Sequence, residues 1–83
     1  MITPCPRCEI VGRQGAVYKA KIIQLNIKLN ICDECEAYWT ENQQIKSYNF
    51  RDLTPLLKAN GLSYEEANFE DLGYLEEDLD NRN

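Results

Sequence analysis

The chain has 83 residues, 43% of them hydrophobic, and a net charge of −5 from 9 Lys or Arg and 14 Asp or Glu residues. This composition fits one small globular domain, and domains of this size often depend on a metal or on disulfides because they bury a small core. It contains no apolar run long enough to span a membrane. The opening MITPCPRC lacks a basic stretch followed by an apolar run, so we expect no signal peptide and a cytoplasmic protein with reduced thiols.

The four cysteines form two CxxC motifs, CPRC at 5–8 and CDEC at 32–35, and the chain has no histidine. A reduced compartment argues against disulfides, and a redox dithiol would need only one CxxC, usually at a helix N-terminus within a βαβ unit. Four thiolates suit a tetrahedral Zn²⁺, with rubredoxin-type iron as the rival. We therefore predict one structural Zn²⁺ per chain, held by Cys5, Cys8, Cys32 and Cys35. Such a site is closed, so the metal argues against catalysis.

The segment between the two motifs predicts a β-hairpin. Residues 16–23 and 27–31 alternate in polarity and are rich in β-branched and aromatic side chains, as strands are. Residues 24–26 are a short turn between them. A hairpin returns the second CxxC to the first, so the motif spacing and the predicted strands agree.

The pattern of CPxC, Gly12, a hairpin and a second CxxC resembles the zinc ribbons over residues 1–39. The resemblance implies a small antiparallel sheet gripping zinc, but it leaves function open, because ribbons serve transcription, RNA enzymes, ribosomes and protein contacts alike. The run CDECEAYW is similar to a subgroup of small bacterial ribbon proteins. In its general character the chain also resembles the immunity proteins of contact-dependent toxin systems.

Tyr38 and Trp39 directly follow the second CxxC. They have two interpretations. Buried, they would wall off the metal and enlarge a small core. Exposed, they would anchor a protein interface, where Trp and Tyr are enriched.

The second half of the chain has a different organisation. Residues 40–48 are polar and indicate a linker or a return strand, and NFRDLTPLLKANGL predicts a helix that Gly61 ends. Pro55 is tolerated only in the first turn, so this helix should start near 52–54. Ser63-x-x-Glu66 matches a capping box and predicts a second short helix reaching about Phe69. The predicted fold is α+β, with a zinc ribbon at 1–39, a helical part at 40–75 packed on it as one domain, and an acidic tail at 76–83.

Charge is distributed unevenly along the chain. Residues 1–60 carry eight Lys or Arg against six Asp or Glu, whereas residues 61–83 carry one against eight. The acidic end is either a solvated face and tail or a mimic of nucleic acid aimed at a basic protein. For the second interpretation we predict the partner-binding residues Glu65, Glu66, Glu70, Asp71, Tyr74 and Trp39.

A basic surface offers the alternative. Its candidate residues are Arg7, Arg13, Lys19, Lys21 and Lys28. Lys19 and Lys21 should project from one strand face and Tyr18 from the other, toward the core. Because the whole chain is acidic and repels phosphate, we expect nucleic-acid binding to be unfavourable.

Catalysis has little support, because the chain lacks a histidine, a nucleophile motif and a glycine-rich phosphate loop, and the predicted metal uses every cysteine. The sequence therefore predicts a non-enzymatic interaction protein. Its function would be that of an immunity or inhibitor protein for a basic partner such as a nuclease toxin. The alternative is a ribbon adaptor in transcription or RNA metabolism.

Overall fold

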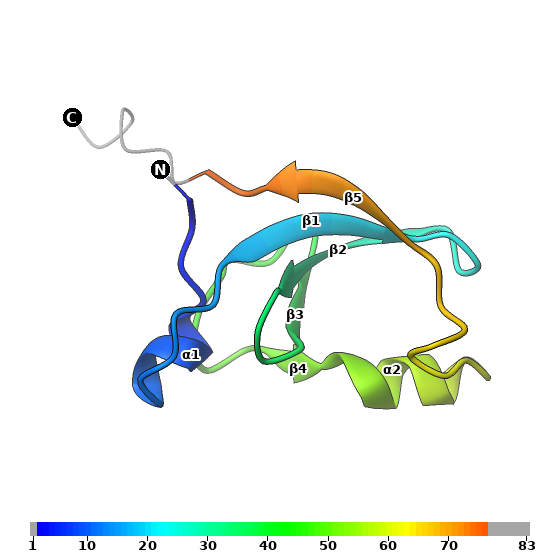
Figure 1. Ribbon diagram of the computed structural model, residues 1–83, viewed down its shortest axis with the longest axis horizontal. Helices are drawn as coiled ribbons and strands as arrows, with labels where there is room; N and C mark the ends of the chain where they lie inside the picture. Colours follow the sequence, from blue (N-terminus) through cyan, green and yellow to red (C-terminus); the bar gives the residue numbers. More distant parts are fainter. Residues whose placement is uncertain (1, 77–83) are drawn as a thin grey trace.

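The computed structural model describes residues 2–76 and has an α+β fold (Figure 1). Its elements, in chain order, are α1 (Pro6–Ile10), β1 (Val17–Ile22), β2 (Ile27–Cys32), β3 (Ala37–Thr40), β4 (Arg51–Asp52), α2 (Leu53–Ala59) and β5 (Phe69–Tyr74). The strands form one antiparallel sheet in the order β4-β3-β2-β1-β5. The predicted fold class is confirmed.

The predicted hairpin is the centre of this sheet. In β1 and β2, Val17 lies opposite Cys32 and Ile22 opposite Ile27. Asn26, the last residue of the turn, takes a φ of 55°, which asparagine tolerates better than most residues. The register returns Cys32 to the end of the sheet where β1 begins, which is the geometry that the metal prediction required.

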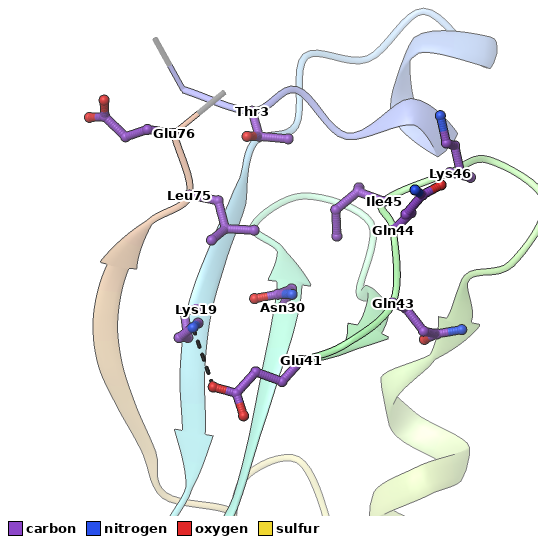
Figure 2. A pocket seen from close by; sticks show the side chains of 10 residues that line it. All are labelled: Thr3, Lys19, Asn30, Glu41, Gln43, Gln44, Ile45, Lys46, Leu75 and Glu76. Carbon is purple, nitrogen blue, oxygen red and sulfur yellow. Dashed lines mark hydrogen bonds and ion pairs between the residues drawn. The ribbon is translucent and has the colours of Figure 1, made fainter. Parts of the chain in front are cut away.

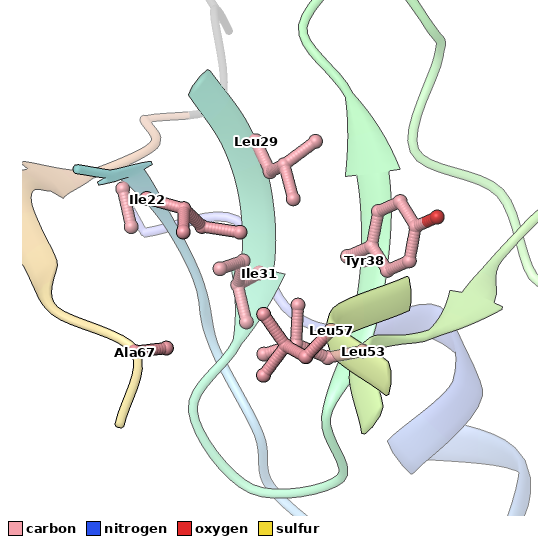
Figure 3. Close-up of a cluster of buried hydrophobic side chains, with 8 residues drawn as sticks. Ile22, Leu29, Ile31, Tyr38, Leu53, Leu57 and Ala67 are labelled. Carbon is pink, nitrogen blue, oxygen red and sulfur yellow. The ribbon is translucent and has the colours of Figure 1, made fainter. Parts of the chain in front are cut away.

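One face of the sheet packs against α2 (Figure 3). Side chains from the three central strands meet two leucines of the helix there; the buried cluster is Ala20, Ile22, Leu29, Ile31, Tyr38, Leu53, Leu57 and Ala67. Tyr18 packs against this cluster, as predicted, since residues of a strand alternate between its faces. The apolar stripe of α2 therefore supplies core that the hairpin alone lacks.

The predicted start and end of α2 are confirmed. Asp52 is its N-cap residue, so Pro55 falls in the first turn, where a missing N–H breaks no helical bond. Gly61 follows the helix with a φ of 74° and donates to the carbonyl of Lys58 at 3.0 Å, while Leu62 donates to the carbonyl of Leu57 at 2.9 Å. This pair of bonds is a Schellman motif, which closes the helix end.

The predicted second short helix is wrong. The capping-box bonds do form, since Glu66 N–H donates to Ser63 Oγ at 3.1 Å and Ser63 N–H to Glu66 Oε1 at 3.0 Å. They stabilise only one turn, and the chain then extends into β5 along the free edge of β1, pairing Ile22 with Phe69. Pairing there satisfies the backbone groups of β1, whereas an isolated helix of so few residues is marginal.

The part predicted as a helical part packed on the ribbon, 40–75, contains α2 and also supplies two strands, β4 and β5, to the same sheet. Glu76 bridges Ile2 and is the last described residue, so the rest of the predicted acidic tail, 77–83, lies outside the described residues. Within residues 2–76 no helix has the length and apolar character needed to cross a membrane.

Candidate metal centre

The first CxxC motif is held by a short helix that the sequence did not reveal. Cys5 is the N-cap of α1, Pro6 occupies its first turn, and Cys8 N–H points at Cys5 Sγ at 3.5 Å. Gly12, with a φ of 80°, ends the helix, and Arg13 N–H donates to the carbonyl of Cys8 at 2.8 Å. The turn around Gly12 therefore fixes the backbone that carries Cys8.

The second CxxC motif forms a tight turn at the end of β2. Two backbone N–H groups, of Glu34 and Cys35, point at Cys32 Sγ at 3.2 and 3.4 Å. Asp33 fastens this turn to the start of β1, because its N–H donates to the carbonyl of Ala16 and its Oδ1 accepts from Ala16 N–H, both at 3.0 Å. Backbone donors aimed at sulfur stabilise a thiolate over a thiol.

The hairpin brings the two motifs into one cluster. Cys5 Sγ lies 3.7 Å from Cys35 Sγ, Cys8 Sγ lies 3.5 Å from Cys32 Sγ, and all four sulfurs lie within 4.8 Å of one another. A tetrahedron with metal–sulfur bonds of about 2.3 Å has sulfur–sulfur edges of about 3.8 Å. The four predicted ligands are therefore placed to hold a single metal ion.

Burial makes this cluster unfavourable as a set of free thiolates. Cys5, Cys8 and Cys32 are buried, and burial raises the pKa of Cys5 to about 11 and raises that of Cys32 as well. Burial also acts to raise the pKa of Cys35, but the N–H of Ala37 and the neighbouring sulfurs lower it overall. A divalent cation supplies the positive charge that four buried thiolates need.

Gly15 lies directly against the sulfurs. The sequence pattern had singled out Gly12 and gave no sign that Gly15 belongs to the site. A Cβ at position 15 would stand 2.5 Å from Cys32 Sγ and 2.7 Å from Cys8 Sγ. Gly15 cannot retreat easily, because its carbonyl accepts the N–H of Cys5 at 2.9 Å. Only a residue without a side chain fits between β1 and this cluster.

Contacts from both motifs reach the start of α2. Arg7 lies over the ring of Phe50, with its guanidinium carbon 4.4 Å from the ring centroid, and its Nη1 is 2.6 Å from Asp52 Oδ1. Directly after the second motif, the carbonyl of Glu36 accepts the N–H of Leu53 at 3.0 Å. A metal that orders the cysteines therefore also orders the segment that begins the helix.

Trp39 belongs to the core beside the cysteines, so its predicted role in partner contact is wrong. Its side chain is 0% exposed and packs in a cluster with Val17 and the buried cysteines. Its Nε1 donates to the carbonyl of Lys46 at 3.0 Å and to Asn49 Oδ1 at 2.8 Å. The indole therefore covers the cysteine cluster and fastens the loop at 41–49 over the sheet.

The other predicted partner-binding residues are exposed. Glu65 and Glu66 lie on the turn before β5, Glu70 and Asp71 on β5, and Tyr74 at its end, 48% exposed. Tyr74 is nevertheless fixed, because its hydroxyl donates to Asp33 Oδ2 at 2.9 Å and its ring packs edge-on against Tyr18. Two of the acidic side chains thus lie on the edge strand β5 and two on the turn that leads into it.

The predicted basic surface is partly neutralised. Arg7 is paired with Asp52, and Lys19 Nζ is 3.3 Å from Glu41 Oε2. Lys19, Lys21 and Lys28 do share the sheet face opposite α2, as the register requires. This face therefore offers fewer free positive charges than the sequence indicated.

No family model, curated protein or solved structure matches this chain.

Proposed function

We propose that this chain is a non-enzymatic, zinc-stabilised interaction protein whose acidic sheet edge binds a basic protein, as an immunity or inhibitor protein would bind a nuclease toxin. One observation carries the proposal. Glu65, Glu66, Glu70 and Asp71 are exposed on the edge strand β5 and on the turn that leads into it, and within residues 2–76 none of these carboxylates forms an ion pair. An exposed cluster of one charge sign steers a partner of the opposite sign and raises its association rate.

Zinc is the metal that we propose for the cysteine cluster. Four thiolates at tetrahedral spacing leave no coordination position for water or substrate, which is the pattern of structural zinc sites. Iron accepts the same four thiolates. Elemental analysis of the purified protein distinguishes them, with one zinc per chain as the expected result.

The partner surface includes a hydrogen-bonding and apolar component. Tyr74 is half exposed at the end of β5 and is already ordered by Asp33 and Tyr18, so it loses little conformational freedom on binding. Tyrosines of this kind are common binding hot spots. We propose that the carboxylates steer the basic partner and that Tyr74 anchors it.

Charge reversal tests the acidic edge. Glu65→Lys with Glu70→Lys is the sharpest variant, because these two side chains form no hydrogen bond within the described structure, whereas Glu66 caps a turn and Asp71 accepts from Gly73 N–H. The probe is the protein encoded by the adjacent gene, measured by stopped-flow association at several salt concentrations. We expect association to slow by about tenfold or more and to lose much of its salt dependence.

A matched control separates the effect of charge at the acidic edge from the effect of the protein's net charge. Glu9→Lys, in α1 at the metal end of the molecule (Figure 1), changes the net charge as much as Glu70→Lys does. An equal effect of both single variants would refute an acidic binding edge. The metal content of every variant should remain that of the wild type, because these positions lie outside the cysteine cluster.

The second candidate is a nucleic-acid adaptor. The arrangement of Lys19, Lys21 and Lys28 on one sheet face favours it. It requires tight binding to RNA or DNA at physiological salt and loss of that binding in Lys19→Glu with Lys21→Glu. Filter binding to single-stranded and duplex probes tests this; tight binding would overturn the inhibitor proposal.

A further inference from the structure

A pocket of about 630 Å³ opens on the sheet face opposite α2 (Figure 2). Its floor is formed by β1 and β2, one wall by the loop after β3, and the other by the chain around the end of β5. The lining residues are Thr3, Lys19, Asn30, Glu41, Gln43, Gln44, Ile45, Lys46, Leu75 and Glu76. None of them belongs to the cysteine cluster or to the acidic edge described above.

Asn30 lies at the centre of the floor (Figure 2). It stands in a row across three strands, between Lys19 of β1 and Trp39 of β3. It is the buried polar residue of the described core, only 4% exposed, and its Oδ1 has no hydrogen-bond partner within residues 2–76. A buried amide oxygen without a donor is rare in folded proteins, because it has lost water and gained nothing in exchange.

The walls of the pocket are preformed. Trp39 Nε1 holds the loop through the carbonyl of Lys46 and the side chain of Asn49. Figure 2 shows Ile45 and Leu75 facing each other above Asn30, with the ion pair of Lys19 and Glu41 beside it. A small molecule would therefore find apolar walls on two sides and a polar floor, the usual make-up of ligand sites.

The charges lining the pocket are balanced, two lysines against two glutamates. This balance favours neither an anion nor a cation. The neutral polar side chains of the lining are Thr3 and the carboxamides of Asn30, Gln43 and Gln44, which donate and accept hydrogen bonds without carrying charge; Gln43 Oε1 already accepts the N–H of Thr40 at 2.8 Å.

We propose that this pocket binds a small uncharged polar molecule that donates a hydrogen bond to the Asn30 carboxamide. The amide turns about χ2, a torsion with a broad energy profile, to present its oxygen to the ligand. The donor is an N–H of a carboxamide or nucleobase, or an O–H of a sugar. The ligand lies between Ile45 and Leu75, and the pocket lining includes neither the cysteines nor the carboxylates of the acidic edge.

Amide NMR with three probes tests this. Nicotinamide, adenine and glucose are titrated separately into the metal-loaded, ¹⁵N-labelled chain to millimolar concentration. We expect saturable shifts from at least one probe, centred on the side-chain amide of Asn30 and the backbone of Ile45 and Leu75. A response to the first two but not to the sugar assigns an N–H donor, and the reverse assigns an O–H donor.

Asn30→Leu provides the decisive variant, because leucine has a similar size and no polar group. If Asn30 binds the ligand, the variant should bind the probe at least tenfold more weakly than the wild type. It should nevertheless unfold at the same or a higher urea concentration, because the substitution removes an unpaired buried amide. Asn68→Leu, at an exposed position outside the pocket, is the matched control and should bind normally. The absence of saturable shifts from all three probes, or a large destabilisation by Asn30→Leu alone, would overturn the proposal. The first result would mean that ordered water alone occupies the pocket, and the second that Asn30 has a structural role.

Discussion

Replacing Gly15 with alanine should weaken the metal site although Gly15 is not a ligand. The added Cβ would lie 2.5 Å from Cys32 Sγ and 2.7 Å from Cys8 Sγ. Both distances are roughly 1 Å inside ordinary van der Waals contact. Since Cys8 and Cys32 belong to opposite motifs, relief of the clash must move at least one sulfur away from the position that the metal requires.

The expected magnitude follows from overpacking. Inserting a methyl group into a well-packed interior costs about 1 to 3 kcal/mol, which corresponds to a loss of roughly 5- to 150-fold in metal affinity. The backbone cannot relieve the strain cheaply, because the carbonyl of Gly15 is held by Cys5 N–H at 2.9 Å. Metal affinity and folding are coupled in such sites, so the free energy of unfolding should fall as well.

Competition with a chromophoric chelator at neutral pH measures the affinity, and the visible absorption of the cobalt-substituted protein reports the geometry around the metal. Gly61→Ala is the control, because its Cβ would meet no atom within 4 Å while its φ of 74° imposes backbone strain. The control should lose stability by about 1 to 2 kcal/mol without changing the cobalt spectrum. Wild-type affinity and an unchanged spectrum in Gly15→Ala would refute the inferred contact with the sulfurs.

Three further predictions concern the cysteines, the loop and the sheet edge. Cys32→Ser removes a ligand from a closed site, so metal should be lost and the chain should unfold; a folded, metal-loaded variant by circular dichroism and elemental analysis would contradict this. Trp39→Phe loses two hydrogen bonds to the loop at 41–49, so the free energy of unfolding measured in urea should fall by about 1 to 3 kcal/mol. Backbone amides of that loop should also exchange faster, and exchange at the wild-type rate would disprove the anchoring role. The bond from Tyr74 to Asp33 raises the pKa of the tyrosine, so its contribution to stability is complete below the ordinary tyrosine pKa and is lost as the pH rises through the raised value. Asp33→Asn should therefore lower the pKa seen in a tyrosinate absorbance titration, and an unchanged titration curve would show that the bond does not form in solution.

The hairpin and α2 were predictable because their signals are local. Alternation in residues 16–31 defines two strands, and Pro55 and Gly61 fix the ends of the helix by their own backbone restrictions. The segment after Ser63 shows the limit of such reasoning. Its capping box forms as predicted, but whether a helix or a strand follows depends on the unpaired edge of β1, more than 40 residues earlier in the chain.

The functional residues also divide into those that the sequence predicted and those that only the structure revealed. The sequence by itself indicated which four cysteines come together as candidate metal ligands, because two CxxC motifs at the ends of a hairpin can meet only at one place. Only the tertiary structure decided which other residues serve that site and which face solvent: it buried Trp39, pressed Gly15 against the sulfurs and left Asn30 unpaired at the floor of a pocket. The physical reason is that ligand spacing is a property of the local chain, whereas burial and close approach depend on which distant segments cover a residue.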